Sequence, residues 1–214
     1  MKTSQLLVSA VPLFQRKAFS LNSVADDFYT KFSKFKILVM PGLHGSDPDH
    51  WQSFWEFRYP EFQRVQQDDW ESAELDIWAQ RLISTALGHS RPVIVVAHSF
   101  GCLATIRATV LAPDLIAGAL LVAPADPARF GVDSILPNST LSIPTLMVAS
   151  TNDPFMGLVN AKHWASQWGS KMLTLTGAGH INVESGFRIW PGGLELLNSV
   201  CEKVAGPKSG NWEY

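Results

Sequence analysis

Ser99, Asp153 and His180 are the three residues of this sequence whose types and order are best suited to joint chemistry. A serine hydroxyl is a poor nucleophile until an imidazole takes its proton, and the imidazole needs an oriented carboxylate behind it. Each of the three is expected on a turn that directly follows a predicted strand. Because the carboxyl ends of parallel strands share one edge of a sheet, these turns bring the side chains together. We therefore predict a catalytic triad in which Ser99 attacks, His180 moves the proton and Asp153 orients the imidazole.

The segment around Ser99 predicts a sharp turn between a strand and a helix. Residues 93–97 are apolar and mostly β-branched, as in a strand buried on both faces, and apolar residues recur at helical spacing over 103–111. A strained nucleophile elbow needs small residues two positions before and two positions after the serine. Ala97 and Gly101 occupy those positions. Ala97 departs from the usual glycine, but it is the mildest departure.

Three other side chains compete for these roles. Asp126 also follows a predicted strand and is the alternative acid, unless it caps a turn. Cys102 is the alternative nucleophile, although the apex of the elbow belongs to Ser99. The chain has two cysteines, Cys102 and Cys201, which are typical of buried reduced thiols rather than of a disulfide framework. His98 adjoins the serine and is expected to point away from its reactive face.

An oxyanion hole needs two backbone N–H groups that converge on one point. Phe100, directly after the nucleophile, is expected to supply the first, at a helix start where the dipole favours negative charge. The second is expected from the loop after the first predicted strand, where Gly42 lets the backbone turn freely. Leu43 is our choice for this donor, with His44 as the alternative.

The substrate pocket is expected to be compact and mostly apolar. The segment 127–140 is interpreted as a loop or a very small lid, too short to cover a long groove. We predict that Gly42, His44, Trp51 and Phe130 bind the substrate, with the ring of Phe100 as a further wall. Short-chain acyl esters are the expected substrates.

Strand and helix patterns alternate along the chain. Strands are expected at 36–40, 62–67, 93–97, 115–122, 143–149 and 172–175. Helices are expected near Trp51, after a cap at Ser72, over 103–111, over 161–168 and over 192–204. This alternation is typical of an α/β protein with three α/β/α layers and a mainly parallel central sheet. We divide the chain into an N-terminal extension (1–35), a single domain (36–205) and a C-terminal tail (206–214).

Composition narrows the class of partner. The chain has 214 residues, 46% of them hydrophobic and 17% charged, with a net charge of −2. These values favour one globular domain over a disordered chain. They offer no basic surface for nucleic acid or membranes, so a small-molecule partner is expected. No metal-ligand spacing and no glycine-rich phosphate loop is found, so neither a metal nor another cofactor is expected.

The expected location is the cytoplasm. The first residues lack a convincing secretory signal, and no apolar run approaches the roughly 18 residues of a membrane span. The sequence does not indicate an oligomeric state.

An ordered set of motifs between about Lys36 and Val204 resembles the RBBP9/YdeN family of small serine hydrolases. The motifs are Pro41-Gly42, His50-Trp51, 67–70 (QDDW), 96–101 (VAHSFG), 121–126 (LVAPAD), 152–154 (NDP), 179–182 (GHIN), 185–187 (SGF) and Trp190-Pro191. The order Ser, acid, His is that of α/β-hydrolases. The resemblance implies an α/β-hydrolase fold with a minimal lid, and Ser99, Asp153 and His180 correspond to the family triad.

The function expected from the residues and the resemblance together is that of a carboxylesterase-like serine hydrolase. It would cleave small carboxylic esters, and less favourably amides, through an acyl-enzyme. Because a fold alone does not fix function, two alternatives stay open: a non-catalytic binding protein of the same fold, and an acyltransferase that uses the same serine. The intact triad argues against the first of these.

Overall fold

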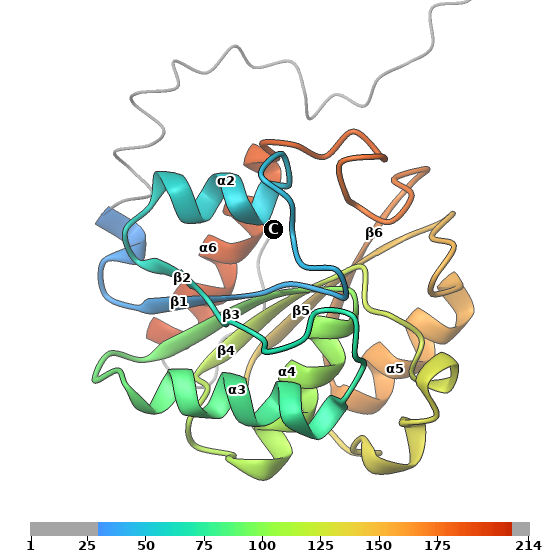
Figure 1. Ribbon diagram of the computed structural model, residues 1–214, viewed down its shortest axis with the longest axis horizontal. Helices are drawn as coiled ribbons and strands as arrows, with labels where there is room; N and C mark the ends of the chain where they lie inside the picture. The colour runs from blue at the N-terminus through green and yellow to red at the C-terminus, as the bar shows by residue number, and fades with distance from the viewer. Residues whose placement is uncertain (1–29, 207–214) are drawn as a thin grey trace, which may run out of the picture.

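The computed structural model describes residues 30–206, which form one six-stranded sheet between two layers of helices (Figure 1). The strand order is β2-β1-β3-β4-β5-β6, and every neighbouring pair is parallel. The strands are β1 (Lys36–Met40), β2 (Phe62–Arg64), β3 (Val93–His98), β4 (Gly118–Val122), β5 (Thr145–Ser150) and β6 (Lys171–Leu175). The α/β-hydrolase fold with a mainly parallel sheet, expected from the sequence, is confirmed.

The central strands are short and apolar on both faces because both faces are covered. Every residue of β1, β3, β4 and β5 is buried, which explains why these segments are continuous apolar runs without alternation. The edge strand β6 is half-exposed along its length. All six strands point the same way, so the turns after β1, β3, β5 and β6 lie along one edge of the sheet.

Within the part of the chain that the structure describes, five α-helices cover the sheet. They are α2 (Trp51–Arg58), α3 (Leu75–Leu87), α4 (Phe100–Leu111), α5 (Leu158–Trp168) and α6 (Pro191–Ala205). Helices α3, α4 and α5 pack on one face, and α2 and α6 on the other, each side with its own apolar cluster (Figure 1). No helix within residues 30–206 combines the length and the apolar character needed to cross a bilayer.

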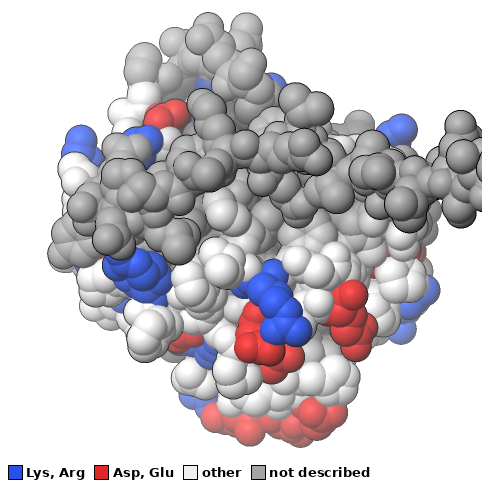
Figure 2. Space-filling view, turned by 90° about the horizontal axis from the view of Figure 1, so that it is seen from above, with Lys and Arg blue, Asp and Glu red and all other residues white. Residues whose placement is uncertain are grey.

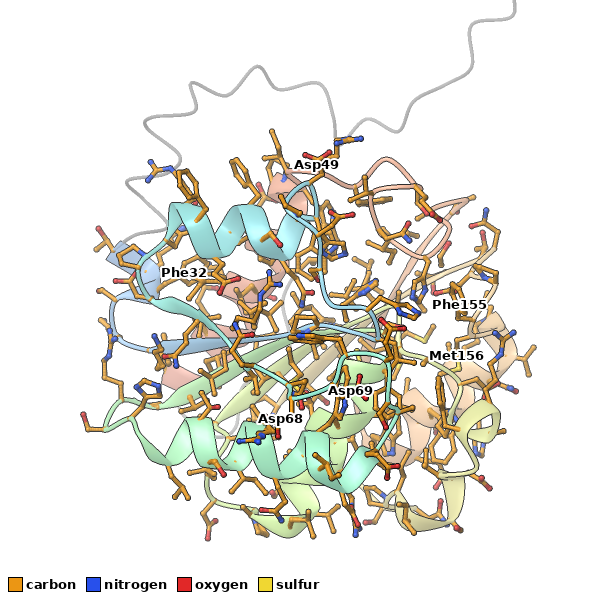
Figure 3. The ribbon with its side chains drawn as sticks, viewed as in Figure 1. Phe32, Asp49, Asp68, Asp69, Phe155 and Met156 are labelled. Carbon is orange, nitrogen blue, oxygen red and sulfur yellow. The ribbon has the colours of Figure 1, made fainter. Side chains whose placement is uncertain are left out.

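The packed core begins before Lys36, so the expected boundary of the N-terminal extension falls too late. Phe32 and Phe35 are buried, and Phe32 lies beneath α2 (Figure 3). Its ring meets Tyr59 and Phe62 edge-on, with centroids 5.9 and 5.4 Å away. These aromatic contacts fix the segment before β1 against the edge strand β2 and the residue that ends α2. The rest of the expected extension (1–29) and the end of the expected tail (207–214) lie outside the described residues.

Two further expectations concern short segments. The segment 127–140 holds two brief 3-10 turns, η2 (Pro127–Phe130) and η3 (Asp133–Ile135), in place of an extended lid. The expected cap of α3 at Ser72 is wrong. Glu74 precedes the helix without a side-chain cap, and the carbonyl of Ser72 instead accepts a hydrogen bond from the indole of Trp78 at 2.9 Å.

Candidate active site

Ser99 lies at the apex of a sharp turn between β3 and α4. Its backbone has φ 54° and ψ −123°. Any residue other than glycine adopts this conformation only at a cost in free energy. Gly101 makes the turn possible, since a Cβ at this position would come within 2.3 Å of the Pro41 carbonyl oxygen. The strained turn thus holds the serine hydroxyl at the carboxyl edge of the sheet.

Gly42 brings the loop after β1 directly against the serine. A Cβ on Gly42 would lie 2.7 Å from the Cβ of Ser99 and 3.3 Å from its Oγ. Any side chain here would collide with the nucleophile. The sequence prediction placed Gly42 in the substrate site, and the structure places it beside Ser99.

Asp153 and His180 form a buried pair across the turns after β5 and β6. Nδ1 of His180 is 3.0 Å from each carboxylate oxygen of Asp153, and the two side chains are 9% and 2% exposed. The carboxylate is fixed further, because its Oδ1 accepts the backbone N–H of Phe155 at 2.8 Å. With Nδ1 held by the acid, Nε2 is the nitrogen left to act as a base.

Three side chains at the end of β5 and directly after it hold the loop that carries His180. Ser150, Thr151 and Asn152 each accept one backbone N–H from consecutive residues of that loop. The pairs are Thr151 Oγ1 with Gly177 at 3.0 Å, Ser150 Oγ with Ala178 at 3.0 Å and Asn152 Oδ1 with Gly179 at 2.8 Å. With the Asp153–His180 pair included, the four residues 150–153 are hydrogen-bonded to the four residues 177–180. The acid and the base are therefore placed by one docked pair of loops.

His98 joins the serine turn to the loop that carries the base. Its Nε2 is 2.9 Å from the carbonyl oxygen of His180, and the two rings are 4.7 Å apart. Because a carbonyl only accepts, this nitrogen carries the proton. Burial, followed by the charges of His180 and His50, holds the pKa of His98 well below its usual value. His98 is thus a neutral support whose Nε2 is engaged by the carbonyl oxygen of His180.

Ser99 Oγ and His180 are not joined by a hydrogen bond in this structure of residues 30–206. What places them together is the contact of His98, adjacent to the serine, with both the ring and the carbonyl of His180. Such catalytic hydrogen bonds often tighten only when substrate binds.

The oxyanion donors expected from the sequence are Phe100 and Leu43, with His44 as the alternative to Leu43. Phe100 is the first residue of α4, so its N–H has no acceptor within the helix. The alternative donor His44 is excluded, because its N–H already donates to the Trp70 carbonyl at 2.9 Å. Leu43, next to Gly42, remains as the second donor of the hypothesis.

With this geometry in place, comparisons with known proteins identify the family. A family model described as serine hydrolase matches residues 37–199, most of the chain. The chain belongs to the serine hydrolase family. The resemblance predicted from its motifs is confirmed.

Solved structures place this serine hydrolase among YdeN-like proteins. It is 41% identical to a YdeN-like hydrolase from Pectobacterium atrosepticum, with a TM-score of 0.81 over 84% of this chain and 98% of that one. The ydeN gene product of B. subtilis is 20% identical, with a TM-score of 0.62 over 78% and 98% of the two chains. A monoacylglycerol lipase from Paleococcus ferrophilus is 13% identical, with a TM-score of 0.59 over 78% and 94%. The last two show the fold alone. A search of curated proteins found no match.

The serine hydrolase does not use Trp51 as a pocket wall, so that prediction is wrong. The Trp51 side chain is fully buried, and its indole N–H donates to the Ile181 carbonyl at 2.9 Å. A buried indole needs such a partner. Its neighbour His50 caps α2 through Nδ1, and burial, followed by the charge of Arg64, lowers the pKa of His50 to about 4. Trp51 thus contacts the His180 loop directly, whereas the His50 ring packs against Trp51 and His98.

The other expected pocket residues divide into three cases. The ring of Phe100 is fully buried, edge-on to Trp78 at 5.1 Å, so its expected place in the pocket wall is wrong. Phe130 is half-buried and packs on the outer side of Phe100 at 4.8 Å. The imidazole of His44 is exposed and pairs with Glu71 at 2.8 Å, which directs it to a carboxylate on the surface.

Phe155 is a site residue that the sequence prediction missed. Its ring lies 4.4 Å from the imidazole of His180 and is 45% exposed, at the turn after β5 (Figure 3). The available signal was its position two residues after Asp153, at the same sheet edge.

The rival acid and the rival nucleophile are both engaged elsewhere. Asp126 caps η2 by accepting the Ala128 N–H at 3.2 Å, and its second oxygen accepts the Asn160 amide at 2.7 Å. The thiol of Cys102 is buried against the Val122 carbonyl, and burial raises its pKa well above the usual value. A thiol in such surroundings is inert as a nucleophile.

Proposed function

We propose that this serine hydrolase is a carboxylesterase that cleaves small carboxylic esters, and less readily amides, through an acyl-enzyme. The observation that supports this most directly is the buried His180–Asp153 pair, held 3.0 Å apart beside a serine at positive φ. The strained turn costs free energy, and a binding protein of the same fold would gain nothing from it.

In the acylation step Ser99 Oγ attacks the ester carbonyl carbon, while Nε2 of His180 takes the hydroxyl proton. The negative charge of the tetrahedral intermediate falls on the carbonyl oxygen, where the N–H groups of Phe100 and Leu43 bind it. Asp153 stabilises the imidazolium through Nδ1. Collapse of the intermediate breaks the ester C–O bond, and the departing alcohol takes the proton from His180.

Deacylation repeats these steps with water as the nucleophile. His180 takes a proton from water, the hydroxide oxygen attacks the acyl carbon, and the second tetrahedral intermediate is bound by the same two N–H groups. Its collapse releases the carboxylic acid and returns the proton to Ser99 Oγ. The triad ends in its starting state.

Mapping the residue that reacts with a fluorophosphonate tests this function. We expect one adduct per chain, on the peptide that contains Ser99, and protection from labelling by an excess of p-nitrophenyl acetate. Mass spectrometry of the digested protein locates the adduct. An adduct on any other residue, or labelling that the ester does not slow, contradicts the proposal.

Short acyl chains should react best. Trp51 and Phe100 lie in the core, and Phe130, the remaining aromatic residue of the expected pocket wall, is half-buried. A methylene contributes about 0.8 kcal/mol only when it is buried, and the two 3-10 turns offer little cover for a long chain. In a series of p-nitrophenyl esters, kcat/KM should be highest between acetate and butyrate. A rise in kcat/KM that continues to the dodecanoate would show a groove for long acyl chains and contradict this prediction.

A further inference from the structure

Arg129 lies at the rim of the candidate active site and is held there by two contacts. Its Nη2 donates to the carbonyl of Pro154 at 2.6 Å, directly after the proposed acid Asp153. Its guanidinium carbon is 5.6 Å from the centre of the Phe155 ring. That same ring contacts the His180 imidazole at 4.4 Å. A single phenyl ring therefore contacts both the guanidinium and the base.

Among the described residues, no carboxylate neutralises the charge of Arg129. Four other arginines of the described chain form ion pairs with acids: Arg64 with Glu56, Arg81 with Asp68, Arg107 with Asp76 and Arg188 with Asp49. Figure 2 shows basic side chains lying directly against acidic ones. Within residues 30–206 no such pair involves Arg129. The acid on the same turn, Asp126, is bonded to Ala128 and Asn160.

The position of Phe155 indicates which part of a substrate would meet this charge. His180 must hand its proton to the leaving group, so the leaving group has to reach hydrogen-bond distance of the imidazole. The half-exposed Phe155 ring borders the imidazole and so borders that group. Arg129 extends the same surface outward. One of its five N–H donors binds Pro154, and a planar fork of donors remains that matches a carboxylate.

We propose that Arg129 binds a carboxylate on the leaving-group side of the substrate, above the apolar ring of Phe155. This inference rests on the proposed esterase function and narrows its substrates to esters of small alcohols or phenols that carry a carboxylate. Phe155 supplies the apolar contact, and Arg129 supplies the charge and the orientation. The proton transfer from His180 is unchanged.

Two acetate esters that differ in one charge test the inference. They are 4-acetoxybenzoate, which is anionic, and its neutral methyl ester. The quantity to compare is the ratio of kcat/KM for the anionic ester to kcat/KM for the neutral one. Comparing this ratio between enzymes cancels the difference in intrinsic reactivity. We expect Arg129→Gln to lower it about tenfold, the size of a charge-assisted hydrogen bond at an accessible site. Arg129→Lys should lower it less, since the charge stays and the fork is lost.

A control and a salt series sharpen the test. Arg91 is another exposed arginine without an ion pair among the described residues. It precedes β3, at the opposite edge of the sheet from Ser99, and its Nη1 donates to the Ser33 carbonyl at 2.8 Å. Arg91→Gln should leave the ratio as in the wild type. Added salt should lower the wild-type ratio toward that of Arg129→Gln, because it screens exposed charges.

Three results would overturn the inference. An unchanged ratio in Arg129→Gln means that the charge does not select substrate. An equal fall for both esters means that the variant only displaces the loop of Asp153. Either result leaves esterase activity itself established. If the wild type cleaves neither ester, the proposed function fails and this inference fails with it.

Discussion

Replacing Ser99 with alanine is expected to lower kcat for ester hydrolysis by about 10⁵–10⁶-fold. The change removes the atom that forms the acyl bond, and the structure offers no second nucleophile at the elbow. Alanine keeps the Cβ that touches the Gly42 loop and adopts the same φ of 54° at no greater strain. The fold should therefore survive. Steady-state kinetics and the Tm of the two proteins, measured together, separate loss of chemistry from loss of structure.

The matched control is Cys102→Ala, which removes the thiol nearest in sequence to the serine. Because this thiol is buried and its pKa is raised, its removal should leave fluorophosphonate labelling in place. The serine variant should not be labelled at all. If Ser99→Ala is still labelled, or if Cys102→Ala is no longer labelled, the nucleophile is Cys102 and not Ser99.

The fold was predictable wherever the decisive information is local. β1 runs over Lys36–Met40 as expected, because a continuous apolar run ended by Pro41-Gly42 specifies a strand buried on both faces. The elbow was predictable for a similar reason, since two small residues at fixed spacing around Ser99 are a steric requirement of the turn. Element ends depend on tertiary packing, and β2 is accordingly shorter than expected.

The pocket was less predictable, because the direction of a side chain is not a local property. Phe100 follows the nucleophile in sequence, yet as the first residue of α4 it faces the core and meets Trp78. Trp51 follows a loop of the active-site edge, and its ring fills the space behind the His180 loop. In both cases the free energy of burying a large aromatic ring outweighs proximity to the site.

The residues that the prediction missed depend on contacts between distant segments. Phe155 and Arg129 come from the turns after β5 and β4, and only the folded sheet brings Phe155 beside His180 and Arg129 against the ring of Phe155. Asn152 is polar and lies in a turn, which suits a surface loop equally well. Its role is visible only through its bond to Gly179 of the next loop.

Asp153→Asn should lower kcat by about 10⁴-fold, the loss seen when a triad imidazole is held in the wrong tautomer. The backbone N–H of Phe155 donates to Oδ1 at 2.8 Å, so the amide oxygen of asparagine should keep that position. The amide NH₂ then faces Nδ1 of His180 in place of Oδ2. A donor at the Oδ2 position favours the tautomer in which Nδ1 accepts and the proton lies on Nε2. An imidazole protonated at Nε2 cannot take the proton of Ser99.

Asp126→Asn is the matched control, since it makes the same change at the other candidate acid. Asp126 accepts from Ala128 and Asn160 and does not bond to a histidine, so kcat should stay within about tenfold of the wild type. Kinetics of the two variants with one ester, alongside their Tm values, decide between the acids. If Asp126→Asn causes the larger loss, the acid follows β4, and the pair seen between Asp153 and His180 is structural. If the two losses are equal and small, His180 works without an acid, and the triad assignment itself is wrong.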